Sequence, residues 1–280
     1  MLIRKKGYLK PRTGRVLKAC RQLEDEGYTL LKRVLSEEEI NKLSREINDI
    51  YKRVTPDGRA SLGLLEEDSA FRYEMFNRGT LCQEVVAHPK ILKTIEPLLG
   101  EDCHVIANTS WRNPPGSDPE HKGGVWHIDG GPHIPLTDDQ VWPSDIPHPV
   151  FAIGTHIFLQ DCPMACGPTG VIPGSNLSGK SPPLNYNMSL TWNNVSAKPL
   201  PAKAGDVAMF VSDTWHRRLP TSDEDSGRFF LQVHYARRDI AQRLRRTTDV
   251  NHVSPQAIAR IKSDREKTLL GLHPPKFYDG

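Results

Sequence analysis

The chain has 280 residues, of which 37% are hydrophobic and 25% are charged, a composition typical of a globular protein and not of a disordered or membrane-embedded one. Its 37 lysines and arginines nearly balance its 34 aspartates and glutamates, so we expect no nucleic-acid partner. Because no run approaches the roughly 18 apolar residues of a membrane span, and the first residues lack the apolar centre of a secretory signal, we expect a cytoplasmic protein without membrane association.

We expect one domain over residues 1–280, with a helical N-terminal part over about 1–100, a β core over about 101–240 and a helical tail over 241–280. The five cysteines are odd in number, which fits reduced thiols. Cys162 and Cys166 are four residues apart, but no second close cysteine pair is available to complete a structural zinc site. A zinc site there is therefore disfavoured.

Helices are expected to dominate the first hundred residues. The pattern predicts a helix over 15–25 and a short strand over 27–35. Ser36 can then cap a helix while Glu39, three residues on, reaches back to it. Apolar residues follow at helical spacing at Ile40, Leu43, Ile47 and Ile50.

A further helical pattern covers residues 81–99. Its apolar positions recur at helical intervals, Pro89 predicts a break and Gly100 predicts the end. The pattern changes at Cys103 to short β-branched and aromatic segments, which are typical of a β-sandwich or barrel. The expected strands are 103–111, 150–160, 169–173, 206–211 and 228–236.

Two segments interrupt or follow this β pattern. Residues 130–150 are rich in proline and aspartate and are too irregular for a strand, so they predict a long loop, which is functional more often than not. The tail from Ser254 to Leu270 is predicted to be helical, with Pro255 in its first turn.

The sharpest local motif is Trp126-His127-Ile128-Asp129-Gly130. On an extended segment His127 and Asp129 point to the same side, so one metal ion could bind both. Imidazole and carboxylate together suit a divalent transition metal, and a second histidine would complete the facial triad of non-haem iron(II). His216 is the best candidate, because it follows the predicted strand 206–211.

Arg228 lies twelve residues after His216 and begins the predicted strand 228–236. With a period of two it shares a face with Phe230, Gln232 and His234. A guanidinium that faces the interior of a barrel requires an anion, and a carboxylate could bind it in a bidentate manner. Each residue also has an ordinary interpretation: His-x-Asp occurs by chance, and an inward arginine commonly pairs with a buried aspartate. The order of these elements favours the functional interpretation.

That order, together with flanking motifs, resembles the phytanoyl-CoA dioxygenase family of 2-oxoglutarate enzymes. The resemblance begins at Asp25-Glu26-Gly27-Tyr28 and is densest from Ser110 to Ala236. It includes Trp126-His127-Ile128-Asp129, the Pro173-Gly174-Ser175 stretch, and Gly205-Asp206 with His216 and Arg228. The resemblance implies a mainly β fold with flanking helices, the cupin-like double-stranded β-helix or jelly roll. It also implies iron(II) held by His127, Asp129 and His216, 2-oxoglutarate held by Arg228, and O2 as oxidant.

The resemblance also marks weaker candidates and departures. Asn176 stands where relatives usually have histidine, and His156 stands where some relatives place a tryptophan that faces the co-substrate. Thr109 matches a position lining the co-substrate site. Three further residues are candidates for substrate contact: Arg112, Trp142 and His133. A solvated turn is the alternative for Arg112, and a surface position is the alternative for His133.

These observations favour a non-haem iron(II)- and 2-oxoglutarate-dependent dioxygenase that hydroxylates a small molecule and releases succinate and CO2. Asp129 argues against halogenation, because related halogenases lack this carboxylate. One alternative is a non-catalytic jelly-roll module that binds a metal or acts as a sensor. Another is a zinc or manganese enzyme of the cupin type, which would use its metal as a Lewis acid and would not need Arg228.

Overall fold

A six-stranded antiparallel sheet forms the centre of the computed structural model, which describes residues 6–8, 16–53, 71–118, 120–242 and 253–272. The strand order is β1-β9-β4-β11-β3-β2. The bounds are β1 Tyr28–Leu31, β2 Phe71–Tyr73, β3 His104–Asn113, β4 Ala152–Phe158, β9 Val207–Val211 and β11 Arg228–Ala236. The expected mainly β fold is thus confirmed, with its strands beginning after residue 101 except for β1 and β2.

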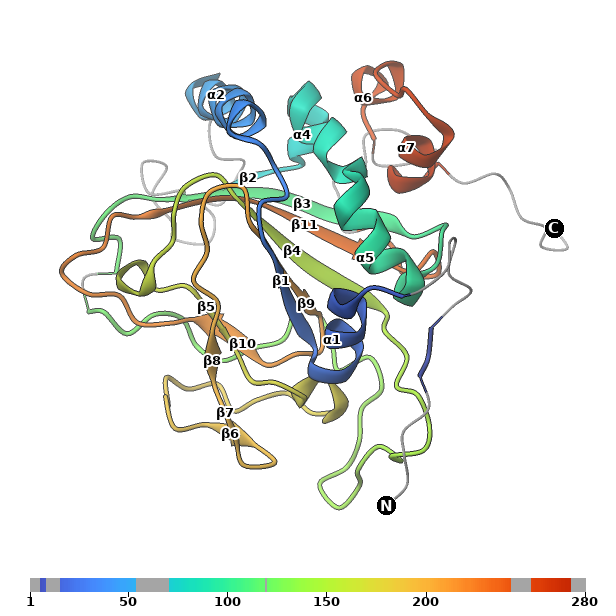
Figure 1. Ribbon diagram of the computed structural model, residues 1–280, viewed down its shortest axis with the longest axis vertical. Helices are drawn as coiled ribbons and strands as arrows, with labels where there is room; N and C mark the ends of the chain where they lie inside the picture. Colours follow the sequence, from blue (N-terminus) through green and yellow to red (C-terminus); the bar gives the residue numbers. More distant parts are fainter. Residues whose placement is uncertain (1–5, 9–15, 54–70, 119, 243–252, 273–280) are drawn as a thin grey trace, which may run out of the picture.

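A smaller sheet faces one side of this large sheet (Figure 1). It has the order β10-β5-β8, with a separate hairpin β6-β7 beside it. The bounds are β5 Thr169–Val171, β6 Thr191–Trp192, β7 Val195–Ser196, β8 Lys198–Pro199 and β10 His216–Arg218. Phe158, Phe210 and Phe230 of the large sheet pack with Val171 of the small sheet in one apolar cluster. Two facing sheets are the arrangement of a jelly roll.

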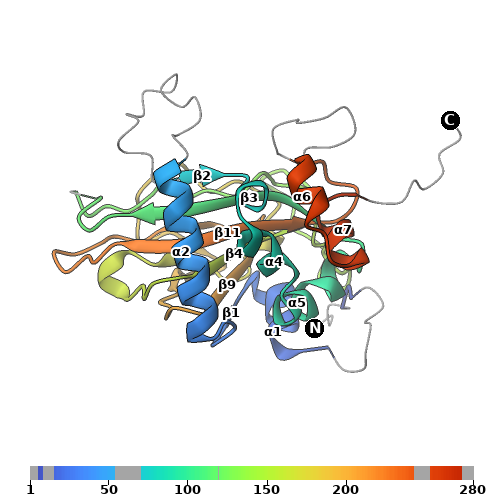
Figure 2. The ribbon, with the colours of Figure 1, turned by 90° about the horizontal axis from the view of Figure 1, so that it is seen from above.

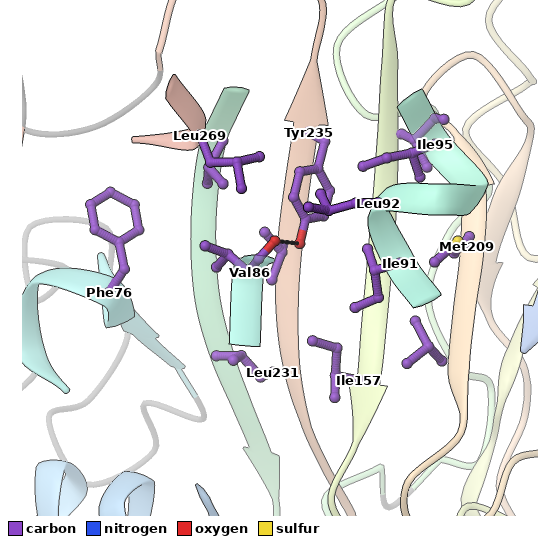
Figure 3. Packing of buried hydrophobic residues seen from close by; sticks show 14 of the residues in the cluster. Phe76, Val86, Ile91, Leu92, Ile95, Ile157, Met209, Leu231, Tyr235 and Leu269 are labelled. Carbon is purple, nitrogen blue, oxygen red and sulfur yellow. Dashed lines mark hydrogen bonds between the residues drawn. The ribbon is translucent and has the colours of Figure 1, made fainter. Parts of the chain in front are cut away.

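Helices cover the opposite side of the large sheet (Figures 1 and 2). They are α1 Lys18–Glu26, α2 Glu37–Arg53, α3 Met75–Arg78, α4 Thr80–Glu84, α5 Pro89–Leu99, α6 Pro255–Ala259 and α7 Asp264–Leu269, with short 3₁₀ turns η3 Val85–Ala87, η4 Met164–Cys166 and η5 Ser175–Leu177. The helix-facing core includes Ile91, Ile95, Ile157, Leu231 and Tyr235 (Figure 3). The buried Tyr235 hydroxyl donates to the carbonyl of Val86 at 2.8 Å, which ties η3 to β11.

Alternation along β11 assigns its side chains to the two layers. Phe229, Leu231, Val233 and Tyr235 belong to the helix-facing core. Arg228, Phe230, Gln232 and His234 therefore face the small sheet, because successive strand residues point to opposite sides. All four are buried or nearly so. The polar residues of this strand consequently lie between the two sheets.

Local sequence signals explain most helix boundaries. Ser36 and Glu39 form the predicted capping box: the backbone N–H of Ser36 donates to Glu39 Oε2 at 2.7 Å, and the N–H of Glu39 donates to Ser36 Oγ at 3.3 Å. The predicted helix over 81–99 is divided into α4, η3 and α5, and the division falls at Pro89 as predicted.

Some boundaries differ from the sequence prediction. The strand expected over 27–35 ends at Leu31, because residues 32–36 turn toward α2. The tail forms two short helices instead of one, and each begins at its own serine cap, Ser254 and Ser263. Arg15 of the first predicted helix, and residues 243–252 and 273–280 of the predicted tail, lie outside the described residues. Among the described helices, none is both long and apolar enough to span a bilayer.

Candidate metal centre

His127, Asp129 and His216 converge on one point between the two sheets. One ligand atom from each residue lies within 4.8 Å of the others. His127 and His216 exchange two backbone hydrogen bonds of 3.0 Å, and the backbone N–H of Asp129 donates to Ser212 O at 2.9 Å. The segment that carries His-x-Asp therefore pairs like a strand beside residues 212–216, which brings the third ligand to the first two.

Both histidines are oriented in the same way. Nδ1 of His127 donates to the carbonyl of Val125 at 2.9 Å, and Nδ1 of His216 donates to the carbonyl of Thr214 at 2.8 Å. A carbonyl only accepts, so in each neutral ring the proton lies on Nδ1 and the lone pair lies on Nε2. Fixing the ring through its other nitrogen is the usual support for a metal-bound histidine. Two oriented imidazoles and a carboxylate thus fit a divalent transition metal.

The charges of Asp129 and His127 agree with this fit. Burial would lower the pKa of His216, but the Asp129 carboxylate outweighs burial and raises it. Burial would raise the pKa of Asp129, but His216 and His234 outweigh burial and hold the pKa below its ordinary value. Burial, followed by the nearby His216, lowers the pKa of His127. Asp129 is therefore ionised and His127 is neutral near pH 7, which are the states that metal coordination requires.

The large sheet provides a close-fitting floor under Asp129. A Cβ added at Gly154 of β4 would lie 2.9 Å from the Phe210 ring and 3.5 Å from Asp129 Oδ2. The Phe210 ring also contacts the His216 ring, with centroids 4.4 Å apart. His234 of β11 places Nε2 at 3.6 Å from Asp129 Oδ2. Gly154 thus leaves room for the Phe210 ring, which packs against His216.

Arg228 is buried between the two sheets, at the opposite end of β11 from His234. It donates to Gly167 O at 3.3 Å and to Asn113 Oδ1 at 3.1 Å. No carboxylate of the described residues lies within salt-bridge distance of it, so the ordinary pairing with a buried aspartate is not found there. Burial, followed by the neighbouring Arg218, lowers the pKa of Arg228 to about 9. A buried cation in this setting is stabilised by an anion.

A hydrogen-bonded row lies between Arg228 and the three ligands. Trp111 Nε1 donates to Gln232 Oε1 at 2.8 Å, which turns the Gln232 amide N–H toward His156 Nε2 at 3.3 Å. His156 Nδ1 then faces Thr169 Oγ1 at 3.3 Å. Burial, followed by the charge of Arg228, holds the pKa of His156 well below its ordinary value, so this ring is neutral. Thr109 pairs with Gln232 across β3 and β11 and is buried in the same row.

The three substrate candidates lie in different places. Arg112 donates to Asn48 on α2 at 2.8 Å and lies over the Tyr51 ring, so it is on the helical side of the sheet and outside the site proposed below. Trp142 donates to Ile146 O at 2.8 Å. It lines an apolar hollow of about 290 Å³ with Pro173, Leu177 and Trp192, and none of the three ligands lines this hollow.

His133 supports the metal motif. Its backbone N–H donates to Asp213 Oδ1 at 2.8 Å, and its Nδ1 lies 2.9 Å from Asp213 Oδ2. Its ring stacks on Phe151 with centroids 5.0 Å apart. Asp213 belongs to the turn before His216, so this contact joins the loop after Asp129 to the segment that carries the third ligand.

Four residues of this site were not assigned from the sequence: Trp111, Asp213, Gln232 and His234. For Gln232 and His234 a signal was present, since the period of β11 places them on the face of Arg228. No local pattern identifies Trp111 or Asp213, because their partners lie far away along the chain.

The sequence model of the phytanoyl-CoA dioxygenase (PhyH) family matches residues 23–225. This range contains all three converging ligands but ends three residues before Arg228.

Solved structures share the fold at low sequence identity. A non-haem alpha-ketoglutarate-dependent carbocyclase, SnoK from nogalamycin biosynthesis, is 20% identical with a TM-score of 0.60, over 82% of this chain and 88% of that one. The epimerase SnoN, in complex with Fe3+, alpha-ketoglutarate and nogalamycin RO, is 16% identical with a TM-score of 0.59, over 89% and 96%. HygX from Streptomyces hygroscopicus, with nickel and 2-oxoglutarate bound, is 12% identical with a TM-score of 0.59, over 80% and 88%. The expected jelly roll is confirmed.

Proposed function

The chain belongs to the phytanoyl-CoA dioxygenase family, and from this premise we propose that it hydroxylates a small molecule at a site formed by His127, Asp129 and His216. The protein is an iron- and 2-oxoglutarate-dependent oxidoreductase. Bound iron(II), with 2-oxoglutarate and O2, supplies the oxidation of an unactivated C–H bond and releases succinate and CO2. The convergence of the three ligands, with both Nδ1 atoms committed to carbonyls, carries the proposal.

Each remaining residue has a role that follows from its place. His127, Asp129 and His216 would hold the metal, and three protein ligands would leave it able to bind 2-oxoglutarate and oxygen. Arg228 binds the distal carboxylate of 2-oxoglutarate. His156 and Thr109 line the space between them, and the neutral ring of His156 avoids adding a second charge there. The packed floor of Phe210 and Phe230 excludes water from the reacting atoms.

The comparisons favour a small-molecule substrate. SnoN was crystallised with nogalamycin RO, and SnoK also belongs to nogalamycin biosynthesis. These neighbours are a carbocyclase and an epimerase, so this fold supports several outcomes of one oxidation. Hydroxylation is proposed here because it needs only that a substrate carbon lies next to the metal.

The test is an anaerobic titration. Purified protein with iron(II) and 2-oxoglutarate is expected to develop the weak visible metal-to-ligand charge-transfer band of a chelated 2-oxo acid. His216→Ala removes one ligand and is expected to abolish the band. Arg228→Ala should keep the metal but weaken 2-oxoglutarate binding, because the buried cation that faces the carboxylate is lost.

The contrary outcomes point to the alternatives. The lack of a band in the wild-type protein would contradict the oxygenase assignment and favour a binding module. Metal-dependent turnover without O2 and 2-oxoglutarate, unchanged in Arg228→Ala, would favour Lewis-acid chemistry.

A further inference from the structure

Arg218 is a second arginine between the two sheets, and it lies on the inner face of the small sheet. It lies two residues after His216 on β10, and alternate strand residues share a face. Its cross-strand neighbour is Thr169, whose hydroxyl contacts His156. Only 14% of the Arg218 side chain is exposed. Arg217 lies between His216 and Arg218 and points to the opposite side of β10. Its guanidinium lies over the Trp126 ring and donates to backbone carbonyl groups of the neighbouring loops.

Arg218 and Arg228 meet at the turn after η4, although they come from different sheets. Arg218 donates to the carbonyl of Cys166 at 3.4 Å, and Arg228 donates to the next carbonyl, Gly167 O, at 3.3 Å. A Cβ at Gly167 would lie 3.2 Å from Arg218 Nε. The two guanidinium groups thus bind consecutive backbone carbonyls, and their proximity is one cause of the lowered pKa of Arg228.

The residues around Arg218 and Arg228 supply less negative charge than these two guanidinium groups carry positive charge. Among the described residues, Asp225 is the one carboxylate within salt-bridge distance of either guanidinium, with Oδ2 3.6 Å from an Arg218 nitrogen. Burial raises the pKa of the nearby Cys162 thiol to about 11, so this thiol is neutral. Nε of Arg218 and Nε of Arg228 are both buried without an acceptor in the described part of the chain. Unsatisfied charged donors are costly to bury unless an anion joins them.

We propose that Arg218 and Arg228 bind the distal carboxylate of 2-oxoglutarate together, with Asp225 holding Arg218 in position. This inference rests on the proposed function. A dicarboxylate would bring the second negative charge that two buried guanidinium groups and one aspartate lack. The competing explanation is that Arg218 only neutralises Asp225 and thereby prevents Asp225 from forming an ion pair with Arg228.

The test compares two ligands by calorimetric titration into nickel(II)-loaded protein, which binds without turnover. One ligand is 2-oxoglutarate, and the other is 2-oxopentanoate, which has the same carbon chain without the distal carboxylate. Arg218→Gln is expected to weaken 2-oxoglutarate binding by about 10- to 100-fold, the effect of a lost charge-assisted hydrogen bond. Binding of 2-oxopentanoate should change by less than about threefold, which also shows that the variant is folded.

Two further variants separate the explanations. In Arg218→Gln with Asp225→Asn, 2-oxoglutarate binding is expected to stay weak, whereas recovery to the wild-type level would show that Arg218 only neutralises Asp225 and would overturn the proposal. Arg218→Lys keeps the charge that neutralises Asp225 but loses the planar fork, so a weakening of at least about fivefold is expected. Wild-type affinity in Arg218→Lys or in Arg218→Gln would also overturn it.

The failure of the proposed function would look different. In that case the wild-type protein itself would bind 2-oxoglutarate no better than 2-oxopentanoate, or would bind neither. A wild-type preference for 2-oxoglutarate that Arg218→Gln leaves unchanged contradicts the two-arginine site alone.

Discussion

Gly154 in β4 leaves room for the Phe210 ring beside the site, although Gly154 is not a ligand itself. The added Cβ of alanine would lie 2.9 Å from the Phe210 ring, and this ring in turn contacts His216. Overpacking in a buried site forces the neighbours to shift and costs about 1–3 kcal/mol. At this position the neighbour that must shift is the Phe210 ring, which packs against the metal ligand His216.

Gly154→Ala is therefore expected to weaken metal binding by about tenfold or more, with a modest loss of stability. The measurement is the dissociation constant for nickel(II) or zinc(II), together with a urea unfolding curve. Gly124→Ala is the matched control, because its Cβ would meet its nearest atom at 3.6 Å, an ordinary contact. Equal metal affinity in both variants would contradict the role given to Gly154.

Asp213 acts on the site through His133. Both its carboxylate oxygens are engaged, one by the backbone N–H and one by the ring of His133. Asp213→Ala frees the loop that follows Asp129 and is expected to weaken metal binding by about tenfold, as loss of supporting contacts commonly does. Asp213→Asn keeps an acceptor for the backbone N–H and should lose less. A metal titration of both variants checks this order, and unchanged affinity in Asp213→Ala would refute it.

At the scale of elements, local sequence signals located most helices and strands but did not show which strands pair with one another. The capping box of Ser36 and Glu39, the break at Pro89 and the strand 228–236 all act within a few residues, and the structure confirms them. β2 and β10, of three residues each, were not predicted as strands. Such short strands depend on neighbours that are distant in sequence, such as Trp111 for Phe71 and Val171 for His216.

The residues of the site divide in the same way: a local sequence pattern predicts some of them, and contacts between distant segments place the others. The His-x-Asp motif and the position of His216 were readable along the chain, and the structure brings them together. The placement of Arg112 on the helical face depends on the register of β3 against β11, which no local pattern gives. The role of Asp213 depends on a turn that packs against a loop 80 residues away.

The buried Gln83 is one of several side chains that join the C-terminal helices to the helical layer. Gln83 in α4 donates to Ala257 O and to Glu266 Oε1, both at 2.9 Å, and accepts from Arg260 Nε at 2.9 Å. Gln83→Ala leaves these buried partners unsatisfied and is expected to lower the free energy of unfolding by about 1–3 kcal/mol. Urea unfolding measures this loss. The charge-transfer band should persist, since the sheet separates Gln83 from the metal ligands, and its loss would argue against that separation.

For the whole molecule, buried neutral histidines make stability depend on pH. Burial lowers the pKa of His104, whose Nε2 donates to Ile240 O at 2.7 Å. The unfolded chain, with an ordinary histidine pKa of about 6.5, then binds protons more readily than the folded chain. The stability that the neutral His104 contributes is therefore complete above about pH 6.5 and is lost as the pH falls below it. The free energy of unfolding of His104→Gln should fall less steeply between about pH 7 and pH 5 than that of the wild type. Parallel slopes would contradict this account.

The metal should stabilise the fold without being needed to form it. Two main apolar clusters, one under the helices and one between the sheets, form the core of the fold from apolar side chains. A metal present at 100 times its dissociation constant adds about 2.7 kcal/mol to stability, which corresponds to a rise in Tm of about 5–10 °C for a chain of this size. Chelation is thus expected to lower Tm by this amount while circular dichroism at 25 °C stays unchanged, and His216→Ala should show no shift on adding metal. Unfolding at 25 °C on chelation would contradict this expectation. It would mean that the metal is needed to keep the segments around His127 and His216 paired and the two sheets together, as in domains that fold only with their metal.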